Sequence, residues 1–131
     1  MSRAPAPTTY IRKAETTLSG ARILLSSGDA DGACSRAYYA MFDAAHAALF
    51  ALQVEAIAAP IKTHNGLVAA FGRRVVATGH IAAEHGGDLN KVQTLRELAD
   101  YSGDPIGIDR AAWAVERAEA FVSAVKAAFG L

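Results

Sequence analysis

Three short segments of the sequence carry residue types that can bind a phosphate group. Ser35–Phe42 (SRAYYAMF) places an arginine and two tyrosines in an otherwise apolar stretch, and Lys62–Gly66 (KTHNG) combines a lysine with a histidine. Arg96–Tyr101 (RELADY) contains an arginine, an aspartate and a tyrosine. A guanidinium binds phosphate oxygens through paired hydrogen bonds and stays charged, and a histidine exchanges protons near neutral pH. These segments are therefore the candidates for a functional site.

Arg96 and Asp100 are four residues apart, so a helix places them on one face. The common explanation is a surface ion pair that contributes ~0.3–0.5 kcal/mol, with Tyr101 covering the end of the helix. The functional interpretation is that the Asp100 carboxylate holds the Arg96 guanidinium toward a phosphate. The residues alone leave both interpretations open.

The other two segments also have an ordinary explanation. Arg36 can lie at a helix edge with its head in water, and Tyr38 and Tyr39 can be core aromatics with bonded hydroxyls. Lys62, Thr63 and His64 lie at the N-terminus of a predicted helix, where backbone N–H groups attract anions, although Thr63 can simply cap that helix. His46 lies among alanines and is expected to be a hydrogen-bonded packing residue.

The composition limits the classes of protein that fit. The 131 residues are 52% hydrophobic, which suffices for a buried core, and the net charge is zero, so any polyanion site must be a local patch. The single cysteine, Cys34, and the lack of a signal-peptide or bilayer-spanning segment predict a cytoplasmic protein that does not enter membranes. The histidines lack His-Glu-x-x-His and Glu-x-x-His spacings, so we predict no metal and no cofactor.

Apolar residues recur at three- and four-residue spacing between helix breakers, which predicts an all-α fold. Short connections favour an antiparallel up-and-down bundle of four to five helices. We expect one domain over residues 1–131, with residues 1–8 flexible. The predicted helices cover about residues 8–27, 29–53, 62–78, 89–101 and 109–129, with loops at 56–60, 80–88 and 102–107.

Several details follow from this segmentation. The expected N-caps are Thr8 or Thr9, then Asp29 or Asp31, Thr63 and Asp109, because these side chains accept hydrogen bonds from free backbone N–H groups. Ile23 and Leu98 are expected to contribute to the apolar core. The glycine pair at positions 86 and 87 is expected to keep the fourth helix from starting before residue 89.

Together and in this order, the three segments resemble the HEPN family of small helical proteins. The matching stretches are Ser35–Leu49 (SRAYYAMFDAAHAAL), Lys62–Phe71 (KTHNGLVAAF) and Arg96–Tyr101 (RELADY). The resemblance extends from about residue 9 to residue 129. It implies a four- to five-helix bundle that forms a homodimer, with the two active grooves meeting at or near the interface.

Many HEPN proteins are metal-independent RNases, and many are toxins encoded beside a nucleotidyltransferase that neutralises them. Their motif is an arginine, four to six residues, and a histidine on one helix. By resemblance, Arg96 takes the arginine position, while Tyr101 occupies the histidine position. A tyrosine, with a reference pKa near ~10, is a poor general base at neutral pH. It can still donate a hydrogen bond, stack on a base or accept a modifying nucleotide.

The resemblance supports two hypotheses of different classes. In the first, the chain is an RNase-like toxin of a nucleotidyltransferase/HEPN pair, and an active form would be a metal-independent endoribonuclease. Arg96, Tyr101 and Asp100 would then be catalytic. In the second, it is a non-catalytic module that binds a nucleotide, RNA or a protein partner. The residues expected to bind nucleotide or RNA are Arg36, Tyr39, Lys62 and His64. A helical scaffold that only forms a dimer is a third option.

Overall fold

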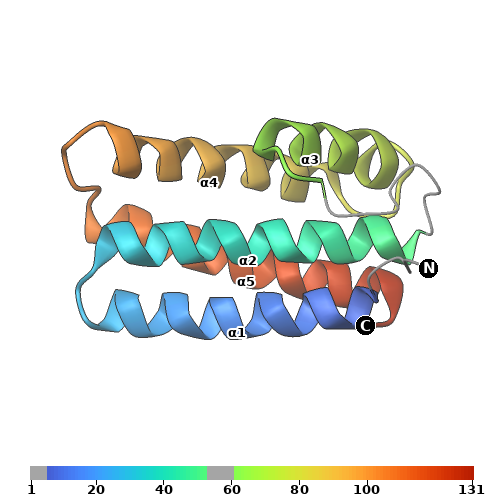
Figure 1. Cartoon of the computed structure of the whole chain (residues 1–131), viewed down its shortest axis with the longest axis horizontal. Coiled ribbons are helices and arrows are strands. Elements are labelled where there is room, and N and C mark those ends of the chain that lie inside the picture. Colours follow the sequence, from blue (N-terminus) through green and yellow to red (C-terminus); the bar gives the residue numbers. More distant parts are fainter. Residues whose placement is uncertain (1–5, 53–60) are drawn as a thin grey trace.

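The computed structural model describes residues 6–52 and 61–131. In these ranges the chain forms five α-helices and one short π-helical turn, and no strand (Figure 1). The elements in chain order are α1 (Pro7–Ser26), α2 (Ala30–Ala51), α3 (His64–Phe71), η1 (Gly72–Val76), α4 (Ala83–Tyr101) and α5 (Ile108–Phe129). The predicted all-α bundle is confirmed, and the expected loop at residues 56–60 lies outside the described residues.

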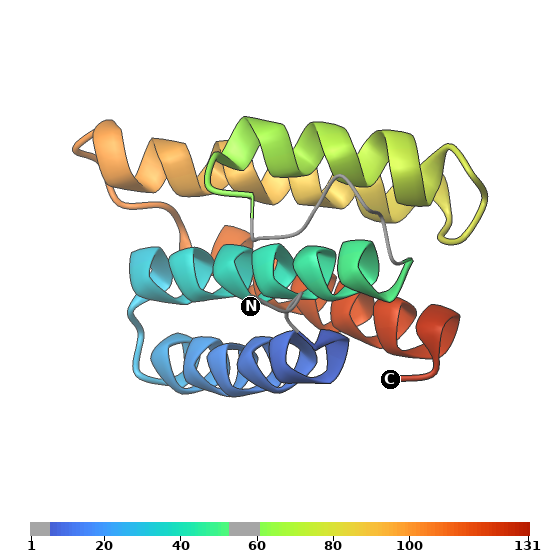
Figure 2. The same ribbon diagram turned by 45° about the vertical axis from the view of Figure 1, so that its right-hand side comes forward.

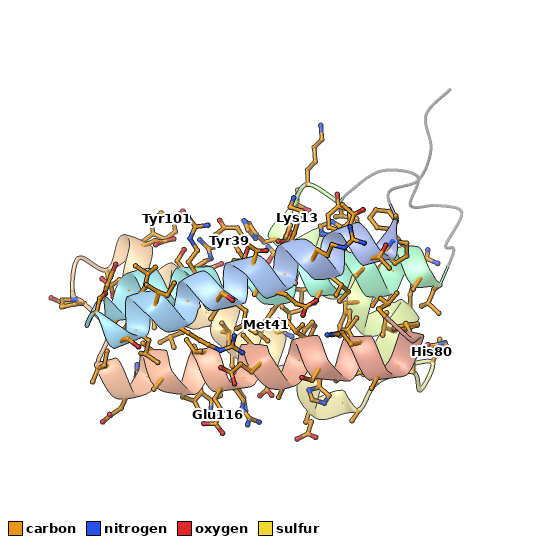
Figure 3. The ribbon with its side chains drawn as sticks, turned by 90° about the horizontal axis from the view of Figure 1, so that it is seen from below. Lys13, Tyr39, Met41, His80, Tyr101 and Glu116 are labelled. Atoms are coloured by element: carbon orange, nitrogen blue, oxygen red, sulfur yellow. The ribbon has the colours of Figure 1, made fainter. Side chains whose placement is uncertain are left out.

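Helix α2 occupies the centre of the bundle and packs against α1, α3, α4 and α5. Figures 1 and 2 show α3, η1 and α4 together on one side of α2, with α1 on the other. This arrangement follows from the small side chains of α2, because alanines at most of its buried positions let neighbouring helices approach closely. The larger core residues fill the space between helices, as with Phe71 and Phe121, whose ring centres are 5.1 Å apart. In Figure 3, Met41 lies among the sticks that fill this interior.

Two of the predicted N-caps are confirmed. The Asp29 carboxylate accepts a hydrogen bond from the Gly32 N–H at 2.8 Å, and the Thr63 hydroxyl accepts one from the Gly66 N–H at 3.1 Å. Asp31, the alternative cap of α2, instead accepts from the Ile106 N–H at 2.9 Å. That bond ties the loop between α4 and α5 to the start of α2.

The other two N-caps were predicted wrongly. Helix α1 begins at Pro7, with Ala6 as its N-cap, because proline has no N–H to satisfy and its φ already suits the first turn. Pro7 and Thr8 are therefore helical, residues 1–5 are outside the described part, and the flexibility of residues 1–8 stays a prediction. Gly107 caps α5, and Asp109 lies in the first turn, where its charge favours the helix dipole.

The chain between α3 and α4 also departs from the prediction. The expected helix over residues 62–78 is α3 followed by the π-helical turn η1, and α4 starts at Ala83, six residues earlier than predicted. Gly86 therefore lies inside a helix, at a cost of about 1 kcal/mol relative to alanine. A Cβ at Gly86 would lie 3.1 Å from Cγ2 of Val76, so this glycine lets α4 approach η1 closely.

Two residues that were expected in the core lie at the surface. Ile23 is 68% exposed and Leu98 is 47% exposed, because the helical period turns them away from the faces that pack. In the part of the chain that the structure describes, no helix combines the length and the apolar character needed to cross a membrane.

His46 is the buried packing histidine that the sequence predicts, with 1% of its surface exposed. Its Nδ1 lies 3.2 Å from the Phe42 carbonyl oxygen, and its Nε2 lies 3.0 Å from the Ile61 nitrogen. Since the Ile61 N–H donates to Nε2, the proton of the neutral ring belongs on Nδ1, which donates to Phe42. Burial lowers the pKa of His46, since a charged ring would lose its hydration.

This histidine predicts a pH dependence of stability. The unfolded chain binds a proton at His46 near its reference pKa of ~6.5, whereas the folded chain does so only at lower pH, so acidification favours unfolding. We expect the free energy of unfolding, from urea titrations, to fall as the pH drops from 7.5 through 6.5 to 5.5. His46→Gln should flatten this slope. If the slope is unchanged in that variant, the pH dependence of stability comes from other groups, such as His64, whose pKa is also lowered.

Candidate functional site

Arg96 lies inside the bundle, where α4 faces α2. The residue is 6% exposed, and its guanidinium carbon lies 5.0 Å from the ring centre of Tyr38 and 5.9 Å from that of Tyr39. One Nη1–H donates to the Asp100 carboxylate at 2.7 Å. The buried Nε–H has no hydrogen-bond partner among the described residues. The cation is thus held by aromatic faces and one carboxylate, and its buried Nε–H donor is unpaired among the described residues.

His64, at the start of α3, joins the same cluster. Its Nδ1 lies 2.7 Å from the hydroxyl oxygen of Tyr38, a residue with no exposed surface. The His64 ring also packs on the rings of Tyr38, Tyr39 and Phe42, with centres 5.3, 6.0 and 5.2 Å away. A histidine and an arginine 32 residues apart in sequence therefore share the same two tyrosine rings.

Gln93 links the helices that carry these two residues. Its amide nitrogen lies 3.3 Å from the Asn65 side-chain oxygen and 3.4 Å from a Glu97 carboxylate oxygen. Asn65 follows His64 on α3, and Gln93 precedes Arg96 by three residues on α4. The long hydrogen bond to Asn65 joins α3 to α4 and restrains the position of His64 relative to Arg96, whereas the bond to Glu97 lies within α4.

The cluster also changes the protonation of its members. Burial, and then the Arg96 charge, lower the pKa of His64, while Glu97 raises it to a smaller extent. Burial raises the pKa of Tyr38 far above the usual tyrosine range, so its phenol stays protonated. Burial, with Asp31 and Asp100, also raises the pKa of the Cys34 thiol to about 12, which excludes a thiolate nucleophile at neutral pH.

The structure brings together four of the seven predicted site residues, namely Arg96, Asp100, Tyr39 and His64. Tyr101 is 80% exposed, and in Figure 3 it lies along the same edge of the molecule as Tyr39. Arg36 is exposed. Lys62 lines a separate groove of about 370 Å³ between α1 and α2, together with Lys13, Asp43 and other residues. Tyr101, Arg36 and Lys62 thus lie outside the cluster around Tyr38, and their roles stay predictions.

Tyr38 was predicted only as a core aromatic, and Gln93 and Glu97 were not predicted to belong to the site. The spacing of three and four residues between Gln93, Arg96, Glu97 and Asp100 places them on one side of α4, and this signal was available. The contact between Tyr38 and His64 joins residues 26 positions apart, so no local spacing in the sequence predicts it.

Arg96 offers little open surface in the single chain, because only 6% of the residue is exposed. Four surface grooves are lined by described residues, and Arg96 is in none of these four. The Asp100 side chain, however, is 39% exposed and accepts one hydrogen bond from the guanidinium. A ligand phosphate could therefore replace the Asp100 carboxylate if that side chain turned toward solvent, since both groups are anions that accept guanidinium hydrogen bonds.

Comparisons of this chain with a family model and with known proteins agree with one another. A model of the HEPN domain matches residues 8–128. UPF0332 protein glr0978 of Gloeobacter violaceus is 38% identical over 91 residues, covering 70% of this chain and 68% of that protein. A protein named Putative toxin MJ0605, of Methanocaldococcus jannaschii, is 35% identical over 118 residues, covering 90% of this chain and 84% of that protein. A UPF0332 protein of Thermotoga maritima is 30% identical over 118 residues, covering 88% of this chain and 84% of that protein.

Proposed function

Because the chain belongs to the HEPN domain family, we propose that it is an RNase-like toxin that acts on RNA through Arg96. The observation that carries this proposal is the buried guanidinium of Arg96, which has a donor unpaired among the described residues and shares two tyrosine rings with His64. A cation placed beside a neutral histidine suits the stabilisation of charge on a phosphate under attack. The names of two relatives, Putative toxin MJ0605 and Putative toxin MJ0142, agree with a toxin.

The test is incubation of the purified protein with labelled RNA in EDTA, together with induced expression in bacterial cells. We expect cleavage that EDTA does not stop and a fall in viable cells after induction. Intact RNA at high protein concentration would contradict the RNase function. Normal growth at high expression would contradict the toxin. As the family resemblance implies, we propose that an adjacent gene encodes a nucleotidyltransferase that neutralises this chain. Co-expression of that nucleotidyltransferase should restore growth.

A second candidate is a non-catalytic module that binds RNA, a nucleotide or a protein. The observation that favours it is the 6% exposure of Arg96 and its 2.7 Å ion pair with Asp100, which close the site in the single chain. Binding of RNA without any cleavage would support this candidate over the RNase.

We also propose that a second copy of the chain covers the surface where α4 ends and α5 begins. Four large apolar side chains are exposed there: Leu98 at 47%, Tyr101 at 80%, Ile108 at 46% and Trp113 at 37%. Leu98 and Trp113 line one groove of about 520 Å³. Its rim carries Lys91, Arg110 and Asp109, a mixture of charges that can pair with itself across a two-fold axis.

Light scattering behind a sizing column tests this interface. We expect a mass of twice 13.7 kDa for the wild type and a shift toward the monomer for Leu98→Asp, since the change buries an unpaired charge. Ile23→Asp, at a 68% exposed position on α1, should leave the dimer intact. A monomeric wild type at high concentration would contradict the proposal.

A further inference from the structure

The segment that carries Arg96 lacks a histidine, but another helix supplies one to the same cluster. The Arg96 guanidinium carbon and the His64 ring centre lie 5.0 and 5.3 Å from the centre of the Tyr38 ring. They lie 5.9 and 6.0 Å from the Tyr39 ring centre. Resting on the RNase function proposed above, we propose that His64 is the catalytic residue that accepts the proton of the attacking RNA hydroxyl. Tyr38 is then the positioning residue that orients the His64 ring.

The bond between Tyr38 and His64 decides which ring nitrogen is available. Nδ1 of His64 lies 2.7 Å from the Tyr38 hydroxyl oxygen, so Nε2 is the nitrogen left for a substrate. The phenol is buried and protonated, and its oxygen can also accept a hydrogen bond. Proton transfer to Nε2 requires the tautomer in which Nδ1–H donates to this oxygen, because Nε2 then carries the lone pair that a proton acceptor needs.

The surroundings of His64 keep its ring neutral at physiological pH. The groups that face it are Tyr38, Tyr39 and Phe42 from α2, and Arg96 and Glu97 from α4. Burial and the positive charge of Arg96 disfavour the charged ring, and they outweigh the negative charge of Glu97. A neutral ring at pH 7 can take up a proton at once.

The step balances without any further reactant except water. The proton of the RNA 2′-hydroxyl passes to Nε2 of His64 while its oxygen forms a bond to the adjacent phosphorus. The bond from phosphorus to the 5′-oxygen breaks, and that oxygen leaves with the electron pair and takes a proton from water. The products are a 2′,3′-cyclic phosphate and a 5′-hydroxyl, and the imidazolium returns its proton to solvent. Arg96 would stabilise the charge that develops on the phosphate oxygens.

The test measures cleavage of a labelled RNA in EDTA for the wild type and three histidine or tyrosine variants. His64→Gln should cleave at least ~100-fold more slowly, as expected for loss of a proton acceptor. Its matched control, His80→Gln, replaces an exposed histidine beyond η1 and should retain the wild-type rate. Tyr101→Phe should lose less activity than His64→Gln. A larger loss in Tyr101→Phe, or full activity of His64→Gln, would overturn the inference while leaving the RNase function standing.

Tyr38→Phe tests the positioning role. Without the hydroxyl, the charged ring of His64 loses an acceptor for its Nδ1 proton, so the acidic limb of the rate profile should move to lower pH. Nitrogen-15 NMR of His64 should show a changed tautomer ratio in this variant, and this readout does not require cleavage. An unchanged tautomer ratio and pH profile would overturn the role of Tyr38. RNA left intact by the wild type would overturn both the inference and the function on which it rests.

Discussion

Arg96→Ala is expected to slow RNA cleavage by at least ~100-fold, the loss typical of removing one charge-stabilising donor from an active site. The physical reason is that alanine removes the cation that lies against Tyr38 and Tyr39 in the cluster with His64. Initial rates on a labelled RNA in EDTA measure the effect. Arg96→Lys keeps the charge but loses the planar fork, so its rate should fall between those of wild type and Arg96→Ala.

The matched control for this variant is Arg22→Ala. Arg22 also makes a short ion pair, to Glu119 at 2.8 Å, but both side chains are about half exposed and lie between α1 and α5. Circular dichroism should show that Arg96→Ala stays folded, because the remaining Asp100 carboxylate is 39% exposed and can be hydrated. Equal rates for the two alanine variants would contradict the role of Arg96.

The largest expected effect on stability is that of Phe121→Ala. Phe121 has no exposed surface and packs against Phe71 at 5.1 Å between ring centres, so alanine would leave a cavity in the core. Such a change typically costs about 3–5 kcal/mol, a large share of the roughly 5–15 kcal/mol that stabilise a domain. Urea denaturation at one fixed protein concentration measures the loss.

Ile23→Ala provides the comparison for this core variant. Ile23 is 68% exposed on α1, so its truncation should change the free energy of unfolding by no more than about 0.5 kcal/mol. Similar losses for the two variants would mean that the described packing of α5 is wrong.

Much of the fold follows from local patterns in the sequence. The alanines of α2 recur at helical spacing, and Asp29 and Thr63 precede helices that need a cap, so these elements were predicted correctly. The start of α4 was predicted wrongly. Gly86 prefers non-helical backbone, but its close approach to Val76 overrides that preference. That contact belongs to the tertiary structure and leaves no local signal.

The candidate site was predicted in part for the same reason. Arg96 and Asp100 are neighbours on one helix, so their spacing was sufficient to predict the ion pair. Their burial was not predictable, since it depends on how α4 faces α2. The pairing of Tyr38 with His64 depends on the packing of α3 against α2 and emerges only in three dimensions.

Arg96 is 6% exposed in the single chain, so the proposed phosphate contact requires a change at Asp100. A phosphate would replace the Asp100 carboxylate, whose side chain can turn toward water because it is partly exposed. The proposed dimer surface includes Leu98 and Tyr101, which flank Asp100 on α4. The proposed dimer surface and the proposed opening of the site therefore lie at the same end of one helix.

The most direct test of this account is the affinity for an RNA that cannot be cleaved because its 2′-hydroxyls are replaced by hydrogen. Fluorescence anisotropy would compare the wild type with Arg96→Ala and Arg22→Ala at one salt concentration. An arginine–phosphate contact of about 1.5–3 kcal/mol predicts a Kd at least ~10-fold weaker for Arg96→Ala, with Arg22→Ala close to wild type. Identical Kd values for the two variants would contradict the claim that Arg96 binds a phosphate.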